Sequence, residues 1–166
     1  MGKGSAMELK IVEMQIPEGA NLILGHAHFI KTVEDLYEIM VTSGLGIQFG
    51  LAFSEASGAC LIRVEGNDEE LMAAAVANAQ NLAAGHTFVI LLRQAFPINM
   101  LNAIKHCQEV CTIHCATANP VQVVVAETQQ GRGILGVIDG FAPKGVEQES
   151  GRAWRYDFLR QIKYKR

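Results

Sequence analysis

The 166 residues of the chain fit one globular domain, which at this length buries roughly 70% of its unfolded surface without help from disulfides or metals. Hydrophobic residues make up 49% of the chain and charged residues 19%, a surplus of apolar side chains that favours self-association. The net charge of −3 argues against a general nucleic-acid-binding protein, which needs clustered lysine and arginine.

The apolar runs and the cysteines of the sequence indicate the cellular compartment that we expect for the protein. No apolar run reaches the roughly 18 residues that a membrane-spanning helix needs, so we expect no membrane contact. Four cysteines without a secretory signal ahead of them favour a reduced, cytoplasmic protein over a disulfide-bonded one. Residues 1–6 are typical of an expression-tag remnant, so we place the single domain at residues 7–166.

The first half of the chain predicts strands, a hairpin and two helices. Apolar alternation predicts a strand over residues 8–16, and a short apolar strand follows at 22–24, with a loop at 25–28. Thr32 and Asp35 have capping-box spacing and predict the start of a helix that ends at Gly44. Two apolar runs, 47–53 and 60–64, predict an antiparallel hairpin. Asn67 is the expected N-cap of an alanine-rich helix that ends at Gly85.

The second half predicts a central strand, two helices and three further strands. Residues 86–92 are apolar without alternation, which is typical of a strand buried on both faces. Pro97 can occupy the first turn of a helix. Strands are expected at 111–116, 121–126 and 134–138, and a terminal helix at 154–163. The order of elements favours an α+β fold: a single compact domain with a mixed, largely antiparallel sheet flanked by helices.

A dense run of cysteine and histidine at residues 106–115 is the first candidate for chemistry. Such side chains could hold zinc or an iron–sulfur cluster, but the cysteines recur every fourth residue, whereas metal knuckles usually place ligands on a turn. If residues 111–116 form a strand, then Cys111, Ile113 and Cys115 share one face as core residues. We therefore favour core packing and assign no metal ligand.

Other polar residues have both a structural and a functional interpretation. His26 and His28 alternate, which suits a metal, a phosphate or a structural role. Glu55 and Ser57 lie in a turn-forming segment, and they could bind a ribose or a metal or simply form the turn. The Gly131-Arg132-Gly133 segment could bind phosphate or form a tight hairpin. Three asparagines could read an adenine edge or simply be solvated, and two of them share the polar face of a predicted helix; they are Asn99, Asn102 and Asn119.

Several long segments carry a family resemblance in a consistent order. They are GHAHFIKTVEDLYE (25–38), FSEASG (53–58), EGND (65–68), GHTFVILLR (85–93), FPINMLNAIK (96–105), EVCTIHCATANPVQVVVAET (109–128) and GRGILGVIDG (131–140). The chain from about residue 7 to 147 resembles the family of adenosine-specific kinases. His26 departs from that resemblance, which implies glutamine at this position.

The resemblance implies a domain that assembles into trimers or multiples of them, with an adenosine or AMP site near the subunit contacts. The substrate-binding residues that it implies are His28, Lys31, Glu55, Ser57, Arg93, Asn99, Asn102, Lys105, Thr117 and Asn119. The catalytic residues that it implies are Glu127, Arg132 and Asp139. Acidic residues would hold Mg²⁺, and basic residues would bind the phosphates of ATP.

The sequence therefore leads to three functional hypotheses. The first is an adenosine- or AMP-binding protein that phosphorylates adenosine with ATP and Mg²⁺. The second is a non-catalytic adenylate sensor that uses the same pocket. The third is an enzyme that acts on another nucleotide.

Overall fold

Eight strands, four α-helices and a short 3₁₀ helix make up residues 6–166, the part of the chain that the computed structural model describes. Of the expected tag remnant, residues 1–5 lie outside the described part. The elements are β1 (Glu8–Glu13), β2 (Asn21–Ala27), α1 (Thr32–Thr42), β3 (Gln48–Ser54), β4 (Ile62–Gly66), α2 (Glu69–Leu82), β5 (Thr87–Arg93), η1 (Pro97–Asn99), α3 (Leu101–His106), β6 (Val110–Thr117), β7 (Val121–Glu127), β8 (Arg132–Asp139) and α4 (Glu149–Gln161).

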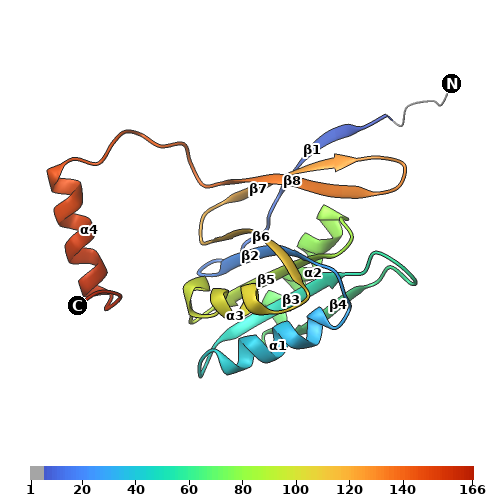
Figure 1. Cartoon of the computed structure of the whole chain (residues 1–166), viewed down its shortest axis with the longest axis horizontal. Helices are drawn as coiled ribbons and strands as arrows, with labels where there is room; N and C mark the ends of the chain where they lie inside the picture. Colours follow the sequence, from blue (N-terminus) through green and yellow to red (C-terminus); the bar gives the residue numbers. More distant parts are fainter. Residues whose placement is uncertain (1–5) are drawn as a thin grey trace.

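The strands form two sheets that lie one above the other (Figure 1). The larger sheet has five strands in the order β4-β3-β5-β2-β6, and the smaller has three in the order β1-β7-β8. Every strand pair in both sheets is antiparallel. An isolated parallel bridge between Ala84 and Arg132 joins the end of α2 to the start of β8. The predicted α+β fold is confirmed.

The space between the two sheets holds the first hydrophobic core. The three-stranded sheet contributes Val121, Val123 and Val125, and α2 contributes its leucine and alanine face. A side-chain carbon at Gly50 of β3 would lie 2.2 Å from the backbone of Leu71, so glycine permits the close packing of α2 on the sheet. The alanine-rich composition of α2 serves the same close approach.

The opposite face of the five-stranded sheet carries the second core, covered by α1 and α3 (Figure 1). Phe49, Phe53 and Phe88 are fully buried there. Because β5 lies in the middle of the sheet with a core on each face, its side chains from Thr87 to Leu92 are all buried. This explains the unbroken apolar run in the sequence.

Four local predictions are wrong, for identifiable reasons. The expected loop at residues 25–28 is mostly strand, because β2 pairs on both sides with β5 and β6. Asp68, not Asn67, caps α2 by accepting from the backbone of Leu71. Asn67 instead bonds the backbone of β3 and the residue before it. Thr32 does not cap α1; its hydroxyl donates to the carbonyl of Phe29.

The fourth wrong prediction concerns β6. A register shift opposite Leu24 and Gly25 places Cys115 in the first core, whereas Ile113 packs against the second. A β-bulge of this kind breaks the alternation of side chains along a strand. Cys111 is exposed, so the three side chains do not share one buried face.

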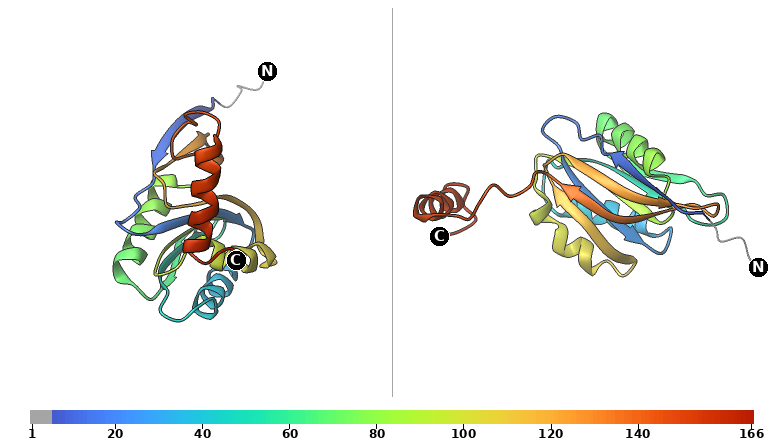
Figure 2. Two further views of the ribbon diagram at one scale, coloured as in Figure 1. Left: turned by 90° about the vertical axis from the view of Figure 1, so that its left-hand side faces the viewer. Right: turned by 90° about the horizontal axis from the view of Figure 1, so that it is seen from above.

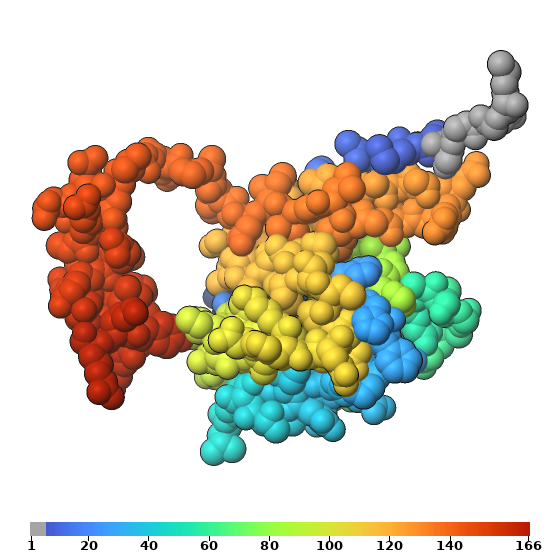
Figure 3. All heavy atoms as spheres, in the orientation of Figure 1, coloured from blue at the N-terminus to red at the C-terminus, as the bar shows by residue number. Residues whose placement is uncertain are grey.

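The C-terminal helix α4 stands away from the two sheets at the end of an extended segment (Figure 2). None of its residues is buried, and Trp154 is 66% exposed. In Figure 3 the dark-red end of the chain reaches back to the yellow-green segment around residues 95–100. None of the described helices is long and apolar enough to cross a membrane.

Candidate functional site

The predicted site residues gather at two opposite ends of the strands. At the end where β2 begins and β8 finishes lie Arg93, Asn99, Asn102, Lys105, Thr117, Asn119 and Asp139. At or near the other end lie His28, Lys31, Glu55, Ser57, Glu127 and Arg132. Strands of seven residues separate the two ends by about 20 Å. One chain therefore does not bring all of these residues to one place.

A cavity of about 720 Å³ opens at the first end, and we call it the aromatic cavity. Its lining residues are Asn21, Phe96, Pro97, Ile98, Leu101, Asn102, Lys105, Ala116, Thr117, Ala118, Phe158, Ile162 and Tyr164. Three of the predicted residues line it. Most of the other walls are apolar, and three are aromatic. Volume and lining are those of a small-molecule site: apolar walls with a few polar groups that orient the ligand.

The walls of the aromatic cavity come from four parts of the chain: Asn21, residues 96–105, residues 116–118 and residues 158–164. Pro97 begins η1, and Phe96 before it is 59% exposed. The side chain of Asn99 accepts a hydrogen bond from the backbone of Phe96 at 2.9 Å. Asn99 therefore shapes the turn instead of lining the cavity. Phe158 comes from α4, and Ile162 and Tyr164 follow that helix and complete the wall.

Two polar residues of α3 line the cavity next to these walls. Asn102 and Lys105 are both exposed, and the ammonium of Lys105 forms no ion pair with any residue in the described part of the chain. An unpaired ammonium beside an apolar cavity is available to an anionic group of a ligand.

A chain of hydrogen bonds runs from the cavity to an exposed carboxylate. The backbone amide of Asn119 donates to the hydroxyl of Thr117 at 3.0 Å. The side-chain amide of Asn119 donates to Asp139 Oδ1 at 3.2 Å. Gly140 next to it has φ +68°, a conformation that favours glycine, and packs against the Asn119 side chain. Asp139 does not itself line the cavity; Asn119 links it to Thr117, which does, and its second oxygen has no partner within the described residues.

A second cavity, of about 870 Å³, lies at the other end, and we call it the histidine cavity. Two of the predicted site residues, Glu55 and Arg132, line this cavity. Its other lining residues include His26, Ser54, Cys60 and His86. The rings of His26 and His86 lie 6.0 Å apart, edge to face. Burial lowers the pKa of His26, and the neighbouring His86 lowers it further. His26 is therefore favoured in its neutral form.

The charged side chains of the histidine cavity are already paired. Glu55 accepts from the backbone of Leu61 at 2.8 Å and from Arg63 at 2.9 Å, and both contacts lower its pKa. Arg132 pairs with Glu127 and donates to the carbonyl of Asn81 at 3.1 Å, at the end of α2. A guanidinium at the C-terminal end of a helix complements the helix dipole. These contacts indicate a structural role for both residues.

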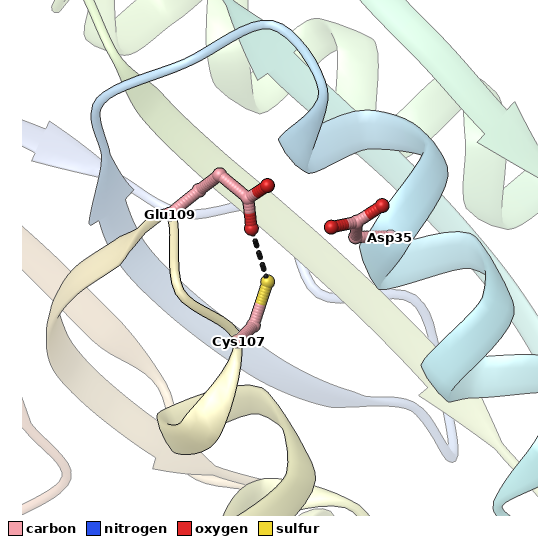
Figure 4. A group of neighbouring side chains, drawn as sticks. All are labelled: Asp35, Cys107 and Glu109. Atoms are coloured by element: carbon pink, nitrogen blue, oxygen red, sulfur yellow. Dashed lines mark hydrogen bonds between the residues drawn. The ribbon is translucent and has the colours of Figure 1, made fainter.

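Lys31 belongs to a third location, at the start of α1. Asp35, Cys107 and Glu109 form the one group within residues 6–166 whose potential metal-ligand atoms all lie close together (Figure 4). Lys31 Nζ lies 2.9 Å from Glu109 Oε1 and also pairs with Asp35. The Cys107 thiol donates to Glu109 Oε2 at 2.8 Å.

The Lys31 ammonium already occupies the cation position of this group. Burial raises the pKa of Cys107 to about 11, helped by Glu109, so the thiol stays protonated. Burial also acts to raise the pKa of Glu109, but hydrogen bonds from Cys107 and Lys31 outweigh it and bring the pKa to about 2. The group therefore suits a structural ion pair between α1 and the turn before β6 better than a metal.

The remaining predicted residues lie outside the cavities. His28 is exposed, with its ring stacked on Phe29. Ser57 is exposed in the β3–β4 hairpin and accepts from the backbone of Cys60 through its carbonyl. Arg93 pairs with Glu70 at 2.7 Å and donates to the carbonyl of Glu18.

Sequence reasoning missed Asn21 and the aromatic walls of the cavity. Asn21 precedes an apolar run after a turn, where asparagine is ordinary, so only its burial reveals it. Phe96, Phe158 and Tyr164 lie far apart in the sequence. The one sequence pattern that pointed to these walls was the four-residue spacing of Trp154, Phe158 and Ile162. This spacing predicts an apolar helix face, but it does not predict which part of the chain the face contacts.

Comparison with known proteins assigns the chain to a family. The profile of the family described as adenosine specific kinase matches residues 12–165. The crystal structure of the PH1918 protein from Pyrococcus horikoshii OT3 is similar, with 41% sequence identity and a TM-score of 0.92. The similarity covers 97% of this chain and 99% of that one. None of the curated proteins matches the chain. The chain belongs to the adenosine-specific kinase family.

Proposed function

We propose that the protein binds adenosine or AMP in the aromatic cavity and phosphorylates adenosine with ATP. The observation that carries the proposal is the composition of this cavity. Aromatic and aliphatic side chains make most of its walls, a buried asparagine lines it, and an unpaired lysine lies beside it. A nucleotide has the matching parts: a flat apolar base with polar edges, a ribose and an anionic phosphate. Membership of the adenosine-specific kinase family supports the same ligand.

The proposal assigns each part of the ligand to a different wall. The base lies among Phe96, Phe158 and Tyr164, where aromatic side chains favour a flat ring. The ribose lies beside Asn102, whose amide can both donate and accept. The phosphate of AMP lies at Lys105.

Asp139 is the best-placed carboxylate for the transfer step. The 5′-hydroxyl oxygen of adenosine forms a bond to the γ-phosphorus of ATP, the bond from that phosphorus to ADP breaks, and the hydroxyl proton leaves to solvent. Mg²⁺ neutralises phosphate charge in such reactions and takes one or two carboxylates from the protein. The partner-free oxygen of Asp139 fits this role. Glu127 does not, since Lys10 and Arg132 already neutralise it.

A second candidate function, an adenylate sensor that transfers nothing, has one observation in its favour. Arg132 and Glu127 are paired with each other at the far end of the strands from the aromatic cavity. Among the described residues of one chain, the lining of the aromatic cavity therefore includes Lys105 but no arginine. Binding without turnover would follow from this arrangement.

The proposed assembly into trimers or multiples of them has surfaces to support it. The outer face of the three-stranded sheet exposes Leu9, Ile11, Leu135 and Ile138, and α4 exposes Trp154. Exposed apolar clusters of this kind mark protein–protein contacts. Light scattering during gel filtration gives the mass, and a monomer at micromolar concentration would contradict the assembly.

Calorimetric titration with adenosine, AMP and guanosine tests the binding. A ligand at 100 times its Kd should stabilise the fold by about 2.7 kcal/mol, or roughly 5–10 °C in Tm. Absence of binding by both adenine compounds would overturn the proposal. ADP and AMP formation from ATP, Mg²⁺ and adenosine then separates the two functions. Binding without ADP formation would establish the sensor, and Asp139→Asn should abolish turnover if the enzyme is correct.

A further inference from the structure

The side chain of Asn21 is the one buried amide that lines the aromatic cavity. Asn21 is the first residue of β2 and is only 7% exposed. Opposite it, across the strand pair, lies Leu92 of β5. Leu92 belongs to the core under α1 and α3, so the side chain of Asn21 points to the face of the sheet on which η1 and α3 lie.

The orientation of this amide follows from its one hydrogen bond. Asn21 Nδ2 donates to the carbonyl oxygen of Ala95 at 3.4 Å. The reversed orientation would bring two oxygens together, so the contact favours the orientation with the nitrogen toward Ala95. Oδ1 is therefore the atom of this amide that is turned away from the Ala95 carbonyl, on a residue that lines the cavity.

Oδ1 accepts no hydrogen bond from any residue between 6 and 166. Every fully buried side-chain nitrogen or oxygen in that range does have a partner. The oxygen of Asn21 is therefore not fully buried, and the residue to which it belongs lines the aromatic cavity. Oδ1 is thus an acceptor on a largely buried, ordered side chain that a ligand donor can reach by displacing solvent.

We infer that Asn21 is the specificity-determining residue for the base, and that its Oδ1 accepts a hydrogen bond from the exocyclic 6-amino group of adenine. This inference rests on the proposed function, and it goes further by naming the atom that is read. Purines with a 6-oxo group present an acceptor where adenine presents a donor. Two acceptors facing each other repel, so the same oxygen that binds adenine disfavours guanine and hypoxanthine.

The experiment compares adenosine with purine riboside, which lacks only the amino group, by calorimetric titration of the full chain. Wild type should bind adenosine about tenfold or more tightly than purine riboside, because the analogue leaves Oδ1 unpaired. In Asn21→Leu this ratio should fall to about one. Asn21→Asp, which keeps an acceptor, should restore a preference for adenosine. Circular dichroism confirms that each variant is folded.

Asn102→Leu is the matched control, because it makes the same substitution in the same cavity. It should weaken both ligands equally and keep the wild-type ratio. Equal binding of the two ligands by wild type, or a ratio that survives in Asn21→Leu, would overturn the inference while the proposed function stands. If wild type binds neither adenosine nor purine riboside, both the inference and the proposed function are overturned.

Discussion

Glu127 and Arg132 face each other across the β7–β8 hairpin as a cross-strand ion pair. Lys10 on β1 approaches the same carboxylate at 2.7 Å, so three strands meet at one acidic side chain. Lys10 and then Arg132 lower the pKa of Glu127. This arrangement joins the sheet together at the end remote from the aromatic cavity.

Arg132→Gln should therefore separate hairpin stability from nucleoside binding. The substitution removes the pair with Glu127 and the bond to the end of α2, so Tm should fall slightly, as for most partly exposed pairs. The Kd for adenosine should stay within about twofold of wild type, because the cavity lies about 20 Å away. Calorimetry measures both quantities. A loss of affinity without a change in Tm would place Arg132 at the nucleoside.

Asn78→Leu should be among the most destabilising single substitutions. The fully buried Asn78 accepts from the backbone nitrogen of Gln15 and donates to its carbonyl, both at 2.7 Å, and so ties α2 to the segment after β1. Leucine would leave both backbone groups unpaired, at a cost of about 2–4 kcal/mol. Tm should fall by roughly 5–15 °C. Asn81→Ala, at an exposed position on the same helix, should change Tm little.

Periodicity and turn chemistry predict most of the elements, because they report local preferences. The unbroken apolar run at residues 86–92 indicated the central strand, and the β3–β4 hairpin followed from the turn between two apolar runs. The length of β2 was missed, because pairing on both sides outweighs the preference of Gly25 and His26 for a loop. The bulge in β6 was missed for a similar reason: register is a property of two strands.

The candidate site was harder to predict because contacts between distant segments define it. Asn102, Lys105 and Thr117 were identified from the sequence, and they line the aromatic cavity. Arg132 looked like a phosphate ligand, but its nearest carboxylate is on the neighbouring strand. Asn21 carried no signal, because an asparagine after a turn is usually solvated.

Stability should decrease as the pH falls from 7 to 5. Burial, followed by the neighbouring His26, lowers the pKa of His114 below 6.5, and His26 is lowered in the same direction. Below about pH 6.5 the unfolded chain binds protons that the folded chain does not, so acid favours unfolding. Urea unfolding at several pH values measures the slope, and His114→Gln should flatten it. A flat wild-type profile would contradict the assignment.

Trp154 should report ligand binding through α4. It is the one tryptophan of the chain, and its ring stacks on Phe158 at 5.1 Å. Phe158 lines the aromatic cavity, so a bound base should change the Trp154 emission with the calorimetric Kd. Phe158→Leu should weaken binding about twofold to tenfold by removing an aromatic contact. Tyr156→Leu is the control, because Tyr156 lies under Arg160 and does not line the cavity.

Lys105→Gln should distinguish AMP from adenosine. The Lys105 ammonium has no carboxylate partner in the described chain and lies beside a cavity with largely apolar walls. A charge-assisted hydrogen bond to phosphate is worth about 1.5–3 kcal/mol, so the Kd for AMP should rise about 10- to 100-fold. The Kd for adenosine should stay nearly constant, because it carries no phosphate. Raising the salt concentration should weaken AMP binding by wild type more than by the variant, since salt screens the charge that only wild type has. Equal losses for both ligands would mean that Lys105 shapes the cavity instead of binding phosphate.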